Sequence, residues 1–235
     1  MNTIMEVGEV REAHRFDTRA LAAYLKRHIN GFPEEFELAQ FGYGQSNPTF
    51  IIRTKEMEYV LRKKPPGELL PSAHAVEREF RILRALAETD VPVPETFILC
   101  EDESVIGTPF YLMRKVEGRI FRDSAASALT DPRERAAIFD AMNDTLARIH
   151  NVDYQALGLS DFGKPGNYMA RQVGRWTKQY RASQTDDLEN MEKLIGWLND
   201  NIPDDDSTSI VHGDFRLENL IIHPAEPRVI ATLDW

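Results

Sequence analysis

The stretch that decides the fold is residues 211–219, which read VHGDFRLEN, together with residues 229–235, which read VIATLDW. In the first stretch Asp214 is followed five residues later by Asn219, and in the second an apolar run ends at Asp234. One irregular loop can therefore present a carboxylate at its start and an amide oxygen at its end. A short hairpin can bring in the second carboxylate. Phosphoryl transfer needs these groups, namely a proton acceptor for the attacking hydroxyl and hard oxygen ligands for Mg²⁺.

The same residues also have a purely structural interpretation. Asp214 could form an Asx turn, and Asp234 could cap a turn at the end of a strand. Either motif alone leaves this interpretation open. Both motifs together, at this spacing and near the end of a chain whose first half is rich in predicted strands, favour a phosphoryl-transfer site.

The pattern H-G-D-x-x-x-x-N, followed by an apolar strand ending in D-W, resembles the aminoglycoside phosphotransferase and choline kinase family. The resemblance implies an α+β, protein-kinase-like fold with two lobes, an N-terminal antiparallel sheet with one key helix and a mostly helical C-terminal lobe. It implies ATP and Mg²⁺ as cofactors, with Asp214 as the catalytic base, Asp234 as the principal Mg²⁺ ligand and Asn219 as a second. His212 would orient the loop, and Arg216 belongs to the same catalytic group.

Hydrophobic periodicity gives the order of the elements along the chain. We expect an N-terminal ATP-binding lobe over residues 1–113 with a leading helix at 17–29, a connector at 114–118, and a C-terminal catalytic lobe over 119–235. The predicted strands cover 36–41, 49–53, 59–62, 96–100 and 109–116. Predicted helices begin after caps at Ser72 and Asp131 and also cover 171–183 and 188–201, with Trp176 interpreted as a core residue.

A glycine-containing turn follows the first predicted strand. Gly42, Gly44, Ser46 and Asn47 lie between two strands, where glycine lets the backbone approach a phosphate closely and exposed N–H groups can bind its oxygens. An ordinary hairpin turn uses the same residue types. The turn is similar to the Gly-x-Ser-Asn hairpin of the phosphotransferase family, which implies a role in nucleotide binding.

Strand alternation places Val60 and Arg62 on one face of the strand 59–62. Val60 would line the adenine pocket and Arg62 would reach the phosphates, at a position where the family has a lysine. Arginine is always charged and can bind phosphate in a bidentate way. Glu79, on the following helix, is the predicted partner of Arg62, and Glu77 is the alternative. An exposed basic strand end and a surface glutamate are the structural alternatives.

The segment 111–118 fits the connector between the lobes. Its backbone could offer N–H and C=O groups to the edge of adenine near residues 114–116, and Met113, Lys115 and Val116 are the predicted contacts. A plain edge strand is the alternative interpretation.

Composition narrows the class of protein further. The chain has 235 residues, 42% of them hydrophobic, and a formal net charge of −10, which disfavours non-specific nucleic-acid binding. We find no apolar run long enough to cross a membrane and no secretory signal. The single cysteine, Cys100, gives no internal disulfide. These features predict a cytoplasmic protein with no nucleic-acid or membrane partner.

Three stretches, 59–67, 118–123 and 212–219, resemble the phosphotransferase domains that are fused to, or encoded near, acyl-CoA dehydrogenases. That branch implies a hydroxylated acyl chain, such as a hydroxyacyl-CoA, as the small-molecule acceptor and an acyl-CoA dehydrogenase as a partner. Related proteins continue past the D-W motif, so we expect an incomplete C-terminal lobe. A catalytically weak nucleotide-binding or interaction module, and an aminoglycoside or choline kinase, are the alternatives. A protein kinase is disfavoured because Gly213 stands where His-Arg-Asp has arginine.

Overall fold

The structure, a computed structural model, describes residues 7–42, 47–65, 67, 74–204 and 207–235. It divides into a larger unit, residues 1–152 with 211–235, and a smaller unit, residues 153–210. The helices are α1 (Thr18–His28), α2 (Val76–Leu86), α3 (Pro132–His150), α4 (Tyr168–Ser183) and α5 (Glu189–Asp200), with 3-10 turns η1 (Glu12–His14) and η2 (Leu217–Asn219). The strands are β1 (Val7–Gly8), β2 (Glu37–Phe41), β3 (Thr49–Arg53), β4 (Glu58–Lys63), β5 (Thr96–Cys100), β6 (Phe110–Arg114), β7 (Leu220–Ile222) and β8 (Val229–Thr232).

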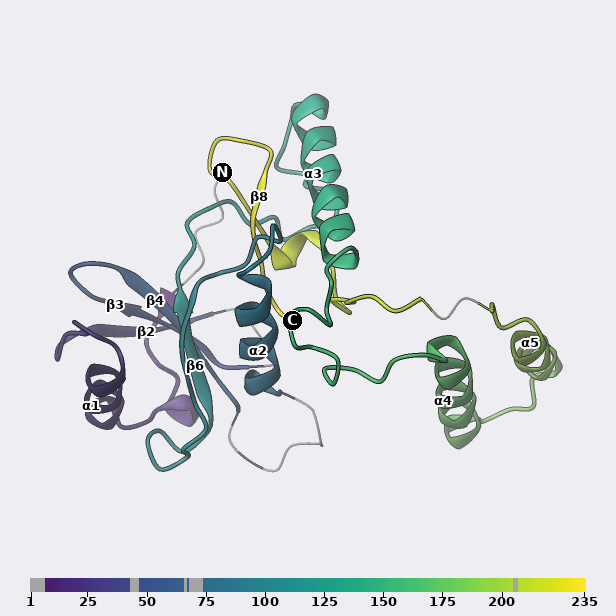
Figure 1. The fold of residues 1–235 in the computed structure, drawn as a ribbon, viewed down its shortest axis with the longest axis horizontal. Helices are drawn as coiled ribbons and strands as arrows, with labels where there is room; N and C mark the ends of the chain where they lie inside the picture. The colour runs from purple at the N-terminus through teal and green to yellow at the C-terminus, as the bar shows by residue number, and fades with distance from the viewer. Residues whose placement is uncertain (1–6, 43–46, 66, 68–73, 205–206) are drawn as a thin grey trace. The chain divides into compact units, whose positions relative to one another are not determined.

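The larger unit is built on a six-stranded antiparallel sheet in the order β1-β2-β3-β4-β6-β5 (Figure 1). Its central strands are apolar on both faces because each face packs against a helix. Leu21 and Leu25 of α1 join one buried cluster with Phe50 and Leu61. On the other face of the sheet, α2 contributes Val76 and Leu83 to a second buried cluster, which includes the following sheet residues: Ile51, Val60, Tyr111 and Met113. The predicted N-terminal sheet with one key helix is therefore present.

Local capping explains two of the helix starts. The Asp17 carboxylate accepts hydrogen bonds from the backbone N–H groups of Arg19 and Ala20, at 2.8 and 3.1 Å, and so begins α1 at the predicted position. Asp131 caps α3 in the same way, with Pro132 in the first turn. The predicted cap Ser72 lies outside the described residues, and α2 begins after Ala75 with no side-chain cap.

A two-stranded sheet, β7–β8, forms the second part of the larger unit. Its apolar residues Leu220, Ile222 and Val229 form a third buried cluster with residues that include Ile138 of α3 and Phe121. Arg119 forms an isolated antiparallel bridge with Ile222, so the segment after β6 runs beside β7. This hairpin, which we call the β7–β8 hairpin, is the hairpin-like region predicted near residue 235.

The smaller unit contains α4 and α5, and neither helix has a buried residue among those described. Trp176 of α4 is 63% exposed and Trp197 of α5 is 60% exposed. The prediction that Trp176 is a core residue is therefore wrong, because helical spacing identifies an apolar face without showing that anything covers it. The predicted lobe boundary at residues 114–118 stays a prediction, since residues on both sides of it belong to the larger unit.

In the described part of the chain, no helix combines the length and apolar character that crossing a membrane requires.

Candidate active site

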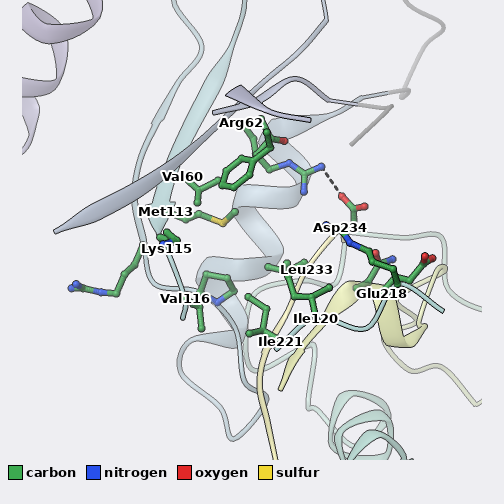
Figure 2. Close-up of a pocket in the computed structure, with 16 residues that line it drawn as sticks. Val60, Arg62, Met113, Lys115, Val116, Ile120, Glu218, Ile221, Leu233 and Asp234 are labelled. Atoms are coloured by element: carbon green, nitrogen blue, oxygen red, sulfur yellow. Dashed lines mark hydrogen bonds and ion pairs between the residues drawn. The ribbon is translucent and has the colours of Figure 1, made fainter. Parts of the chain in front are cut away.

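A cavity lies in the larger unit between one face of the six-stranded sheet and the β7–β8 hairpin (Figure 2). Seven of its lining residues were predicted as site residues from the sequence: Val60, Arg62, Met113, Lys115, Val116, Asn219 and Asp234. The sequence reasoning missed nine others: Phe41, Thr49, Pro94, Arg114, Ile120, Arg122, Glu218, Ile221 and Leu233.

The cavity has two apolar walls. Val60 and Met113 are paired across β4 and β6 and point into it from the sheet. They are faced by Ile120, which follows the connector, by Ile221 of β7 and by Leu233, which follows β8 (Figure 2). A flat apolar group such as a purine base fits between walls of this kind. The only signal for the second wall in the sequence is the apolar character of short runs after Gly118.

Arg62 joins the sheet to both α2 and the hairpin. Its Nη1 lies 2.8 Å from Oε1 of Glu79, and its Nη2 lies 2.6 Å from Oδ1 of Asp234. The contact between Arg62 and Glu79 predicted from the sequence is therefore present, whereas Glu77 pairs instead with Lys64 at 2.8 Å. Arg62 Nε is buried and has no hydrogen-bond partner among the described residues.

The pKa shifts around Arg62 arise because one guanidinium cation pairs with two carboxylates, those of Glu79 and Asp234. Burial raises the pKa of Glu79 to about 7, with Asp234 adding to the shift and Arg62 and the Tyr111 hydroxyl opposing it. The pKa of Arg62 rises despite its burial, because the two carboxylates favour the guanidinium cation. Burial also raises the pKa of Tyr111 well above its ordinary value, with Glu79 adding to the shift. Arg62 is thus held as a fixed positive charge at the edge of the cavity.

The loop after residue 211 brings the three predicted oxygen-bearing residues together. The Asn219 amide nitrogen donates to the backbone oxygen and to Oδ2 of Asp214, at 2.9 and 3.0 Å. The backbone oxygen of Asn219 accepts from the N–H of Leu233 at 2.8 Å, which places Asp234 next to it. Asp234 has a φ of 65°, a left-handed conformation that is uncommon outside glycine and often marks functional sites.

His212 holds the two loops together. It is buried, its Nε2 lies 2.8 Å from the backbone oxygen of Leu233, and its Nδ1 lies 3.3 Å from the backbone N–H of Asp214. Nε2 must therefore carry the proton and Nδ1 must accept, which describes a neutral ring. Burial lowers the pKa of His212, in agreement with this tautomer. The geometry agrees with the orienting role predicted for His212.

Arg216 belongs to the same loop as Asp214 and Asn219, but it does not line the cavity. Its Nε is 3.3 Å from both Asp214 Oδ2 and Glu218 Oε2, and its side chain is 57% exposed. Glu218 itself lines the cavity and was not predicted, because a glutamate within a loop motif has no local pattern that distinguishes it from a surface residue.

The glycine-containing turn is only partly described. Gly42 accepts a hydrogen bond from Arg11 through its backbone oxygen at 3.0 Å, and Asn47 is buried with its Oδ1 3.1 Å from His74 Nδ1. Neither residue lines the cavity. The predicted site residues Gly44 and Ser46 lie outside the described residues.

The connector is more constrained than the sequence suggested. The backbone N–H groups of Arg114 and Lys115 donate to the backbone oxygens of Glu95 and Glu58, at 2.7 and 3.1 Å, so both donors are already used. The Lys115 side chain pairs with Glu58 and Glu117. The backbone N–H groups of Arg114 and Lys115 are therefore occupied, and the contact between this segment and adenine stays a prediction.

The oxygen donors at the cavity suit Mg²⁺. Asn219 uses its amide nitrogen for Asp214, which leaves its Oδ1 for other contacts, and Asp234 presents a carboxylate that is 46% exposed. The described residues contain no cluster of three or more His, Cys, Asp or Glu side chains suited to a metal ion. Mg²⁺ takes one or two protein oxygens and completes its shell with phosphates and water, so Asn219 and Asp234 would be a sufficient protein donor set.

The cavity, the fixed arginine and the Asp-Asn loop define a phosphotransferase type of site. The chain belongs to the phosphotransferase enzyme family, which matches it over residues 37–235. The family and the enzyme class predicted from the sequence are therefore confirmed.

Two curated relatives carry acyl-CoA dehydrogenase names. Acyl-CoA dehydrogenase family member 10 of Mus musculus is 53% identical over 230 residues, which are 96% of this chain and 21% of that protein. Acyl-CoA dehydrogenase family member 11 of Homo sapiens is 48% identical over 235 residues, which are 98% of this chain and 30% of that protein. The chain thus spans less than a third of the length of either relative.

Solved structures show the same fold. A Ralstonia eutropha protein proposed to be an aminoglycoside phosphotransferase is 52% identical, with a TM-score of 0.84 over 94% of this chain and 65% of that one. The streptomycin-ATP-APH(2")-IIa ternary complex is 18% identical, with a TM-score of 0.62 over 93% of this chain and 70% of that one. The second likeness concerns the fold alone. The predicted kinase-like α+β fold is confirmed.

Proposed function

We propose that this chain is the nucleotide-binding and catalytic part of a small-molecule kinase that transfers the γ-phosphoryl group of ATP to an acceptor hydroxyl. The observation that carries the proposal is the chain of contacts from Asp214 through Asn219 to the loop of Asp234, and from Asp234 to Arg62. Asn219, Asp234 and Arg62 line one edge of the apolar cavity, and Asp214, which does not line it, contacts Asn219 directly. Phosphoryl transfer uses an acid, an amide, a second acid and a cation in this way.

The nucleotide would lie with its base between the two apolar walls and its phosphates toward Arg62. Val60 and Met113 would contact one face of adenine, and Ile221 and Leu233 the other. Arg62 supports this placement, because it lines the cavity and its guanidinium is a fixed positive charge that attracts phosphate oxygens. Asn219 and Asp234 would hold Mg²⁺, which when bound neutralises charge on the phosphate oxygens.

In the reaction, Asp214 would accept the proton of the acceptor hydroxyl. The hydroxyl oxygen bonds to the γ-phosphorus, the bond from that phosphorus to the β-phosphate oxygen breaks, and ADP leaves. The Asp214 side chain is 56% exposed, so an acceptor can reach it. Asn219 fixes Oδ2 of Asp214 at 3.0 Å, and His212 fixes the backbone of the same residue.

The acceptor is proposed from the relatives. Proteins named as acyl-CoA dehydrogenase family members contain a segment like this chain, which supports a hydroxyacyl-CoA or related hydroxy acid as acceptor and an acyl-CoA dehydrogenase, fused or encoded nearby, as partner. An aminoglycoside or choline-type acceptor is the second candidate, supported by the name of the similar Ralstonia eutropha protein.

A phosphate-transfer screen tests the proposal. Hydroxyacyl-CoAs, choline-like amines and aminoglycosides are each supplied with Mg·ATP, and ADP release is followed for the wild type, Asp214→Asn and the control Asp90→Asn. Asp90 has a 72% exposed side chain and does not line the cavity. We expect turnover that Asp214→Asn reduces by at least about a hundredfold and Asp90→Asn leaves unchanged. Equal turnover in the wild type and in Asp214→Asn would refute the role of Asp214 as the catalytic base. No thermal shift with Mg·ATP would favour a module without catalysis.

A further inference from the structure

The β7–β8 hairpin carries both candidate metal ligands, one at each side of its open end. Asn219 immediately precedes β7, and Asp234 comes two residues after β8. The N–H of Leu233 donates to the backbone oxygen of Asn219 at 2.8 Å and closes this end. Whatever fixes the hairpin on the rest of the larger unit therefore also fixes the place of the two ligands.

Arg119 fixes the other end of the hairpin. Its Nε donates to the backbone oxygen of His223 at 2.9 Å, and its Nη2 donates to that of Glu226 at 3.0 Å. Both oxygens lie in the turn between β7 and β8. The guanidinium is nearly buried, with 14% of the side chain exposed, and its Nη1 lies 2.5 Å from Oε1 of Glu134 in the first turn of α3.

The backbone of Arg119 adds a second attachment. Its N–H donates to the oxygen of Ile222 at 2.7 Å, and its oxygen accepts from the N–H of Ile222 at 2.8 Å. The next residue, Ile120, lines the cavity together with Ile221. One residue therefore holds β7, the turn, α3 and a cavity wall in a single arrangement.

The chemistry of the side chain explains why arginine occupies this position. A planar guanidinium directs several N–H donors along fixed, divergent lines, so it can reach two carbonyls and a carboxylate at once. A lysine ammonium is a compact charge and would reach fewer of these acceptors in good geometry. If Arg119 is replaced, the oxygen of the half-buried His223 loses its donor, whereas the oxygen of the exposed Glu226 can bond to water, so the main effect is on the position of the turn.

We infer that Arg119 is a positioning residue for the candidate magnesium site: it sets the hairpin that presents Asn219 and Asp234, without contacting substrate itself. This inference rests on the proposed function. Residues that orient metal ligands from behind typically change metal affinity by about 10- to 100-fold when they are replaced. Arg119 acts on the hairpin and not on the side chains of Asn219 and Asp234 themselves, so we expect an effect near the lower end of this range.

The test compares metal-dependent and metal-free nucleotide binding in the 235-residue chain. A fluorescent ATP analogue is titrated without Mg²⁺ and then against increasing Mg²⁺, for the wild type, Arg119→Lys and Glu134→Gln. The matched control is Arg228→Gln, because Arg228 lies in the same turn and its Nε is 3.2 Å from Glu226, but its side chain is 59% exposed. Steady-state kcat and KM for ATP are measured with an accepted substrate.

We expect Arg119→Lys to raise the half-saturating Mg²⁺ concentration about tenfold. Metal-free binding should fall by a smaller factor than metal-dependent binding, because the base contacts from Val60 and Met113 on the sheet are untouched and only those from Ile221 and Leu233 move with the hairpin. Glu134→Gln should raise the half-saturating Mg²⁺ concentration by a smaller factor, and Arg228→Gln should leave it unchanged. In Arg119→Lys, kcat should fall by a larger factor than KM for ATP rises.

An unchanged Mg²⁺ requirement in a folded Arg119→Lys overturns the inference, and so does an equal loss of metal-free binding, which would indicate a general structural role. If Arg119→Lys does not fold, Glu134→Gln decides by the same two readouts. If the wild type binds no nucleotide at all, the proposed function fails instead, and the two failures are thereby distinguished.

Discussion

Gly118→Ala is the sharpest test of how the connector is packed on the hairpin. A Cβ built on Gly118 would lie 2.4 Å from Cγ2 of Ile221 and 2.5 Å from the backbone oxygen of Ile222, with Cδ1 of Ile230 at 3.2 Å. Real Cβ contacts are essentially never shorter than 3.0 Å. Because one of the two closest atoms belongs to the backbone, a rotamer change cannot relieve the overlap.

The cost can be worked from these contacts. Overpacking of a well-packed site costs about 1–3 kcal/mol. Displacing the Ile222 oxygen also weakens its 2.7 Å hydrogen bond from the N–H of Arg119, which adds about 1 kcal/mol. Alanine has less conformational freedom than glycine in the unfolded chain, which offsets about 0.4–1 kcal/mol of this loss of stability. We therefore expect a net loss of about 1–3.6 kcal/mol, or a fall in Tm of roughly 2–14 °C.

The control is the same chemical change in open space. Gly8 has no atom within 4 Å of a built Cβ and no positive φ, and it belongs to the same unit. Gly8→Ala should leave stability unchanged or raise it by less than about 1 kcal/mol.

Urea unfolding can be followed by the fluorescence of Trp235, which stacks on His212 at a centroid distance of 4.6 Å. The other two tryptophans of the chain, Trp176 and Trp197, lie in the smaller unit and are mostly exposed, so replacing both with Phe isolates the signal of the larger unit. Equal midpoints for Gly118→Ala and Gly8→Ala would refute the packing argument.

Three further predictions use residues of the site. Glu79→Ala should destabilise the larger unit by about 3 kcal/mol, because Arg62 then keeps only Asp234 as a partner. The control Glu77→Ala removes a more exposed pair with Lys64 and should cost under about 1 kcal/mol. The two variants are compared by their midpoints of urea unfolding. The pKa of Glu79 is about 7 in the folded chain and about 4.3 when unfolded, so the folded state binds more protons between these values. The free energy of unfolding should therefore fall as pH rises from about 4.3 to about 7, and this slope should flatten in Glu79→Gln. Val60→Phe should fill the apolar cavity and weaken ATP binding at least about tenfold, and because Val60 also belongs to the second buried cluster it should cost about 1–3 kcal/mol of stability. Unchanged affinity in the folded variant would place the adenine base elsewhere.

Much of the fold could be predicted because its signals are local. Asp17 and Asp131 cap α1 and α3 through N–H groups within three residues, so the sequence near each cap is sufficient. Strand alternation placed Val60 and Arg62 on the face that lines the cavity. The resemblance implied an acidic partner for Arg62 on the next helix, and helical spacing then separated Glu79 from Glu77. The caps and the strand faces needed only the period of one element and the residues at its ends.

The second wall of the cavity could not be predicted in this way. Ile120, Ile221 and Leu233 belong to short apolar runs that also fit an ordinary core. They line a cavity only because the connector crosses β7 at Gly118, where the absence of a side chain permits the close approach. A sequence pattern records that a residue is apolar, but the position of a neighbouring segment decides whether its side chain is enclosed or faces a space.

Arginine at position 62 is where the sequence departs from the family pattern, and the geometry supplies a reason for it. A lysine ammonium at the end of β4 is a single charge, whereas two different nitrogens of Arg62 reach Glu79 at 2.8 Å and Asp234 at 2.6 Å. Arg62 and Asp234 are 172 residues apart in sequence, so no local pattern could have predicted this contact. Because α2 and the β7–β8 hairpin are linked through one guanidinium, a shift of either element changes the position of the candidate metal ligand. The arginine thus couples the sheet wall of the cavity to the β7–β8 hairpin, which a lysine paired with Glu79 alone would not do.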